Sequence, residues 1–115
     1  MPSETQHCLL AILADTGVRS TLIDWLLNYS EDMVFSSAPV EWHGIDPTHF
    51  NVAEQVTGRQ SKLLFHIQTS FGEAHRLCEQ LGRAFAGAQL RYWILPLLEA
   101  GILAAEHAAP QGGEG

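Results

Sequence analysis

Basic residues and long apolar runs are scarce in this 115-residue chain. Six Lys and Arg stand against thirteen Asp and Glu, which gives a net charge of −7, and the six are scattered along the sequence. Proteins that bind nucleic acid normally carry a clustered basic patch, so nucleic acid and anionic membranes are poor candidate partners. No apolar stretch approaches the ~20 residues that cross a bilayer, and the first seven residues do not resemble a secretory signal.

Cysteine is scarce as well, since Cys8 and Cys78 are the only two. They are too few and too far apart to indicate a disulfide framework. Both lie in apolar stretches, which favours reduced core thiols and disfavours a reactive thiolate. The chain also lacks a serine nucleophile motif and paired carboxylates, so we predict that it is not an enzyme. We expect a soluble, cytoplasmic protein without direct membrane insertion.

Apolar patterning, with 46% hydrophobic residues, predicts four strands and two helices. The expected strands are 7–14, 33–42, 60–68 and 88–95, and the expected helices are 18–29 and 71–85. Their order is the βαββαβ pattern of ferredoxin-like α+β folds, with a four-stranded antiparallel sheet. We expect a single domain over 1–107 and a flexible Gly-rich tail over 108–115.

Three local signals refine this prediction. Pro39 cannot donate to a strand ladder, so the second strand is expected at a sheet edge. Ser70 and Glu73 predict a capping box at the start of the second helix, and Gly87 is expected to end that helix.

The strands are apolar on both faces, whereas two helices can cover only one face of a four-stranded sheet. In the first strand, Leu9, Ala11 and Leu13 alternate with Leu10, Ile12 and Ala14. An open apolar face usually marks an association surface, and each large side chain buried there contributes ~1.5–3 kcal/mol. The sequence therefore predicts an obligate oligomer.

Candidate ligands for a metal ion lie in a long stretch without apolar period, residues 42–57. His43 and His49 are there, close to Glu41, and imidazole and carboxylate suit zinc, copper or nickel. No HxH, HxxxH or CxxC spacing accompanies them, so single surface histidines are the alternative. Trp42 is the tryptophan expected to contact a ligand or partner.

Three segments together resemble the PII-like superfamily of small trimeric signalling proteins. They are Ile23–Leu27, Glu54–Gln60 and Leu90–Gly101, and the likeness spans about Cys8 to Leu103. In particular, the chain resembles a family of uncharacterised bacterial PII-like proteins often encoded beside heavy-metal efflux pumps. The resemblance implies a homotrimer with the sheets facing its centre, ligand sites in the clefts between subunits, and an effector loop that contacts a membrane transporter or efflux component.

The same resemblance places Gly58, Arg59 and Gln60 in the cleft between subunits, with Glu41 and Trp42 as further ligand contacts. An Arg there can hold a carboxylate or phosphate in bidentate fashion, although Arg59 could equally pair with an acidic neighbour. The tripeptide lies at the far end of the loop, whereas PII proteins carry a similar one near its start. No Gly-rich phosphate-binding loop is present either, so the sequence does not predict a nucleotide site.

These observations lead to a regulatory hypothesis and two alternatives. A PII-like trimer binds a small ligand or metal ion between its subunits and presents the 42–57 loop to a protein partner, here a component of heavy-metal efflux. The first alternative is a metal-binding protein that buffers or delivers a transition-metal ion. The second is a structural oligomer without a ligand.

Overall fold

The computed structural model describes residues 3–44 and 59–104 of the chain. Its four strands are β1 (His7–Asp15), β2 (Phe35–Trp42), β3 (Gln60–Ser70) and β4 (Arg91–Pro96). Within these ranges the α-helices are α1 (Arg19–Tyr29) and α3 (Phe71–Ala84). The short 3-10 helix η1 (Thr16–Val18) precedes α1, and η3 (Ala86–Ala88) follows α3. None of the helices described is long and apolar enough to cross a membrane.

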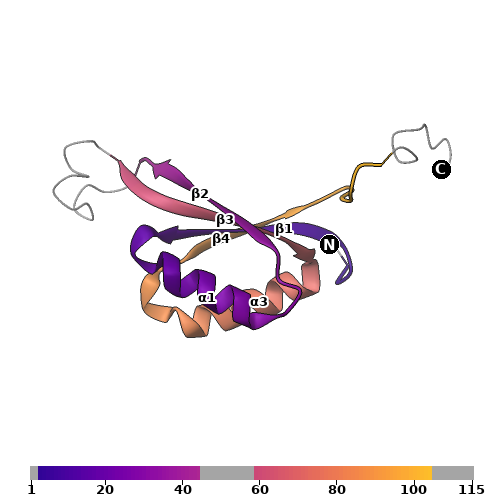
Figure 1. Ribbon diagram of the computed structural model, residues 1–115, viewed down its shortest axis with the longest axis horizontal. Helices are drawn as coiled ribbons and strands as arrows, with labels where there is room; N and C mark the ends of the chain where they lie inside the picture. Colours follow the sequence, from indigo (N-terminus) through magenta and orange to yellow (C-terminus); the bar gives the residue numbers. More distant parts are fainter. Residues whose placement is uncertain (1–2, 45–58, 105–115) are drawn as a thin grey trace.

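The strands form one antiparallel sheet in the order β2-β3-β1-β4, and both α-helices lie on the same face of it (Figure 1). This arrangement confirms the predicted ferredoxin-like fold. The expectation for Pro39 is confirmed too, because β2 is an edge strand. The two central strands, β1 and β3, are those whose apolar patterns are the most continuous.

The main core lies between the sheet and the two helices. Alternate residues of β1 and β3 point toward the helices because side chains alternate along a strand. Phe65 and Leu10 are fully buried there, against Leu22 and Leu26 of α1 and Leu77 of α3. This layer fixes the sheet and so sets the positions of the strand ends, where the candidate site lies.

None of the helices in residues 3–44 and 59–104 lies on the opposite face of the sheet (Figure 1). The strand register places Leu9 beside Leu95, Ala11 beside Trp93, and Leu13 between Leu64 and Arg91 on this face. Ala11 and Leu13 are buried by their neighbours within the subunit, whereas Leu95 remains 47% exposed. The predicted open apolar face is therefore present, and we call it the open face.

The ends of α3 differ from the prediction in two details. The Ser70 hydroxyl caps the helix by accepting a hydrogen bond from the Glu73 amide at 3.2 Å. The Glu73 carboxylate does not complete the predicted capping box, because it accepts hydrogen bonds from Tyr29 and Arg76. The helix ends at Ala84, before Gly87. The left-handed residue that redirects the chain into β4 is Gln89, with φ of 53°. The tail predicted over 108–115 lies outside the described residues.

Candidate functional site

The predicted site residues gather at the end of the sheet where β2 finishes and β3 begins. Trp42, the last residue of β2, pairs with Gln60, the first residue of β3. Both ends of the intervening segment are thus held side by side. A cleft of about 510 Å³ opens here, lined by Asp15, Trp42, Gln60, Lys62, Ala88, Gln89, Leu90 and Arg91. We call it the loop-base cleft.

The loop-base cleft has more positive than negative charge, although the chain as a whole is acidic. Lys62 Nζ forms an ion pair with Asp15 Oδ1, and the Lys62 side chain is only 18% exposed. The guanidinium of Arg91 lies 5.6 Å from the centroid of the Trp42 ring, a cation–π distance. No carboxylate of the described residues forms an ion pair with Arg91. One carboxylate therefore faces two cations, and the site favours an anion.

The register also shows which face these side chains share. Lys62 pairs with Asp15 and with Val40, and Arg91 pairs with Leu13, so they continue the rows of the open face. The loop-base cleft is therefore the polar end of an otherwise apolar surface. A subunit packed on the open face would border the cleft directly.

Glu41 and Arg59, both predicted ligand contacts, are paired with each other. Arg59 Nε lies 3.2 Å from Glu41 Oε2, and His43 Nε2 lies 3.6 Å from Glu41 Oε1. The alternative in which Arg59 pairs with an acidic neighbour is thus the one observed in the isolated subunit. None of these three side chains lines the loop-base cleft, although they are chain neighbours of its lining residues Trp42 and Gln60. Gly58 is outside the described residues.

The structure describes only one of the two predicted metal ligands, His43. His43 has one carboxylate neighbour, Glu41, and both side chains are about 60% exposed. Among residues 3–44 and 59–104, no group of three His, Cys, Asp or Glu side chains is arranged to hold a metal ion. His49, the second predicted ligand, falls outside those ranges. The described part of the chain therefore supplies two ligands at most.

The thiols have the properties expected of core cysteines. Cys8 is buried and Cys78 is partly buried, and neither forms a disulfide. Burial raises the pKa of Cys8, while burial and then the neighbouring Cys8 raise the pKa of Cys78. Both thiols are therefore protonated at neutral pH, which makes them poor nucleophiles.

Sequence reasoning overlooked Asp15, Lys62, Gln89 and Arg91, which complete the loop-base cleft. A signal for two of them was present, because Lys62 and Arg91 are single cations within apolar strands. By alternation, Lys62 shares a face with Leu64, and Arg91 shares one with Trp93. Placing those two faces on one side of the sheet required the register between distant strands.

Comparison with known proteins gives the fold and the family. The chain resembles a DUF3240 family protein from Shewanella baltica OS155 with a TM-score of 0.68 and 20% identity, over 86% of this chain and 98% of that one. It resembles a functionally unknown protein from Pediococcus pentosaceus ATCC 25745 with a TM-score of 0.58 and 9% identity, over 86% and 99% of the two chains.

A third similar structure is a proposed PII-like signalling protein from Thermus thermophilus. The TM-score is 0.55 and the identity 12%, over 81% of this chain and 88% of that one. None of the curated proteins matches this chain. The family model of proteins of unknown function DUF3240 matches residues 4–104, nearly the whole domain, and the chain therefore belongs to the DUF3240 family.

Proposed function

We propose that this protein is a PII-like regulatory protein that binds a small anion in the loop-base cleft. In this proposal it is a homotrimer, has no catalytic role, and presents the 42–57 loop to a protein partner. The observation that carries the proposal is the placement of Arg91, without a carboxylate partner among the described residues, over Trp42 at the start of that loop.

The cleft suits a small ligand with an anionic group. The Arg91 guanidinium can donate two parallel hydrogen bonds to a carboxylate or phosphate, and Lys62 adds a second positive charge. The Trp42 ring offers an apolar surface to the rest of the ligand. Association through the open face would enclose the cleft between subunits and exclude water, which strengthens the attraction between opposite charges.

Binding in the cleft can be communicated to the loop because the cleft contains its two flanking residues. A ligand that contacts Trp42 and Gln60 biases the loop only by the difference in its affinity for the two loop states. The fold shared with a proposed PII-like signalling protein supports this reading. The resemblance to proteins encoded beside heavy-metal efflux pumps supports an efflux component as the partner.

Calorimetric titration tests the proposal. The panel is ATP, ADP, inorganic phosphate, bicarbonate and citrate, with the intact oligomer as the receptor. Arg91→Gln should weaken binding of the active anion at least about tenfold, because a hydrogen bond to a charged group contributes ~1.5–3 kcal/mol. Arg83→Gln is the matched control, since Arg83 is exposed on α3 and does not line the cleft. Equal affinities for the two variants would refute the site.

The second candidate is a protein that buffers or delivers a transition-metal ion. It is favoured by one observation, the contact between His43 and Glu41 at the end of β2. A single imidazole and a single carboxylate bind a metal ion weakly, so His49 or a second subunit must complete the site. Saturable zinc binding that survives Arg91→Gln but not His43→Ala would favour this function over anion sensing.

A further inference from the structure

The chain leaves the sheet after β4 as an exposed segment, residues 97–104, which we call the C-terminal arm. Its first residue is fixed, because the Leu97 amide donates to the His7 carbonyl at 3.0 Å and the Leu97 carbonyl accepts from Gln6 Nε2 at 2.9 Å. Beyond it, the exposed fractions of Leu98, Ile102 and Leu103 are 103%, 91% and 88%. Single exposed aliphatic residues are ordinary, but three on one short segment indicate a contact surface.

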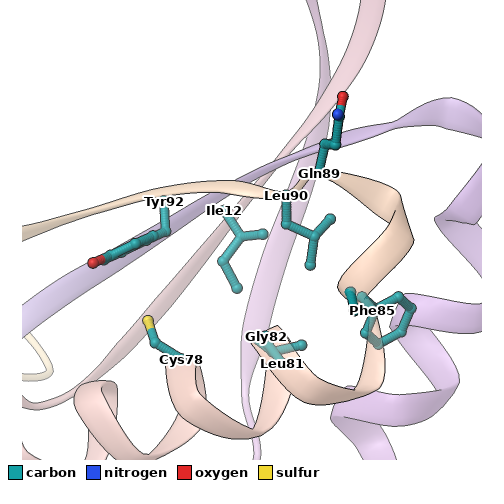
Figure 2. A pocket seen from close by; sticks show the side chains of 9 residues that line it. Ile12, Cys78, Leu81, Gly82, Phe85, Gln89, Leu90 and Tyr92 are labelled. Atoms are coloured by element: carbon teal, nitrogen blue, oxygen red, sulfur yellow. The ribbon is translucent and has the colours of Figure 1, made fainter.

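An apolar cavity of about 230 Å³ lies between α3 and the start of β4 (Figure 2). Ile12 of β1 forms its roof, Leu81 and Phe85 approach from α3 and its end, and Leu90 and Tyr92 close it from the side of β4. Engineered apolar cavities of ~150 Å³ accept a benzene-sized guest. This cavity therefore has room for a branched aliphatic side chain.

The arm and the cavity lie at opposite ends of β4. The cavity is next to Leu90 and Tyr92, at the beginning of the strand, whereas the arm starts after Pro96 at its end. Figure 1 shows the arm running away from the body of the subunit, on the side opposite to the turn from α3 into β4. The arm therefore does not cover the cavity of its own subunit.

We propose that the C-terminal arm of one copy docks its aliphatic side chains into the α3–β4 cavity of a neighbouring copy. The arm and the cavity are both apolar, and every chain has one of each. The arm of one copy can therefore fill the cavity of another, and no other protein is needed. From Pro96 to Ile102 the extended chain reaches about 20 Å, which is enough to cross to an adjacent subunit.

This contact is heterologous, since it joins two different surfaces of identical chains. Head-to-tail contacts form a closed ring when the rotation between copies closes, and a ring is the assembly required by the proposed function, on which this inference rests. It places a second contact on the helical side of the sheet, separate from the open face and from the loop-base cleft. Loss of the arm contact therefore need not remove anion binding.

Cys78 makes the proposal testable, because its thiol lies in the wall of the cavity while Cys8 is 1% exposed (Figure 2). A cysteine is introduced in the arm as Leu98→Cys, Ile102→Cys or Leu103→Cys, and the intact protein is oxidised with diamide. At least one variant should give disulfide-linked species of two and three subunits on a non-reducing gel, and a thiol reductant should return them to one subunit.

Two control variants test whether the disulfide joins the arm to Cys78. Adding Cys78→Ser to the reactive arm variant should abolish the linked species. Leu27→Cys, at a half-exposed site on α1, should not form them. Linked species that persist without Cys78 indicate contact between arms and overturn the proposal. A linkage confined to single subunits, or none in all three variants, overturns it as well.

Sedimentation equilibrium of the same samples separates this inference from the proposed function. If the protein is an oligomer but the arm does not link to Cys78, arm docking is wrong and the proposed function is unaffected. If the protein is a monomer, both proposals are wrong. A second variant avoids disulfide chemistry. Ile102→Asp should raise the dissociation constant of the oligomer about tenfold or more, and Leu27→Asp should leave it unchanged; equal effects of the two would contradict arm docking.

Discussion

The guanidinium of Arg91 lies over the ring of Trp42 and so connects the two edge strands of the sheet, β4 and β2. Two strands, β1 and β3, separate them in the sheet order. The contact therefore spans the loop-base cleft on the open face and holds the residue at which the 42–57 loop begins. In the proposed function, a ligand that pairs with Arg91 would change what Trp42 contacts, and this change would link the cleft to the loop.

The first prediction concerns the free energy of this contact. A double-mutant cycle with Trp42→Leu and Arg91→Gln should give a coupling of about 0.5–1 kcal/mol, as expected for a cation–π pair at an exposed site. Urea unfolding of the four proteins measures it. The cycle of Trp42→Leu with Arg83→Gln is the control and should be additive. Additivity in both cycles would mean that the Arg91 contact does not stabilise the fold.

The second prediction concerns assembly through the open face. Sedimentation equilibrium at micromolar concentration should give about three times the subunit mass of 12.7 kDa. Leu95→Asp places a charge on the open face and should shift the equilibrium toward monomer, since a buried unpaired charge is strongly unfavourable. Leu27→Asp, at similar exposure on α1, should not. A monomeric parent protein contradicts both the assembly and the proposed function.

The third prediction concerns stability at alkaline pH. Burial, followed by the hydrogen bond to Glu73, raises the pKa of Tyr29 above its ordinary value of 10.0. The folded state therefore holds this proton more tightly than the unfolded chain. The stabilisation is complete below the unfolded pKa and is lost as pH rises through the folded pKa. Urea midpoints should fall above pH 10.0 and fall less in Tyr29→Phe. Parallel pH profiles would show that Tyr29 is not responsible.

The sequence predicted the fold well because its signals are local. Alternating apolar residues identify the strands, Pro39 identifies an edge, and the doubly apolar β1 indicates the open face. The loop-base cleft was only half predicted, since Lys62 and Arg91 meet Trp42 through the register of strands distant in the chain. Similarly, the residue in the left-handed conformation after α3 is Gln89 and not Gly87, although glycine adopts that conformation at the lowest cost.

The fourth prediction concerns metal binding by His43 and His49. If His43 and His49 hold a metal ion, zinc titration should show saturable binding above pH 7 that weakens as the solution is acidified, because protons compete with the metal ion for the imidazole nitrogens. Replacing both with Ala should remove binding while the oligomer is retained. His75→Ala, on α3, is the matched control. Unchanged binding in the double variant means that these residues do not hold the ion.

The fifth prediction concerns coupling between the cleft and the loop. The anion that binds in the titration panel should slow amide hydrogen exchange across residues 42–57 relative to the ligand-free protein, because Trp42 and Gln60 flank the loop and line the cleft. Amides of the buried strand β1 should not change. The same anion should have no such effect on Arg91→Gln, and shortening the loop should spare the oligomer but abolish partner binding. If bound anion leaves loop exchange unaltered, the cleft does not control the loop, and the protein is an anion-binding oligomer without this switch.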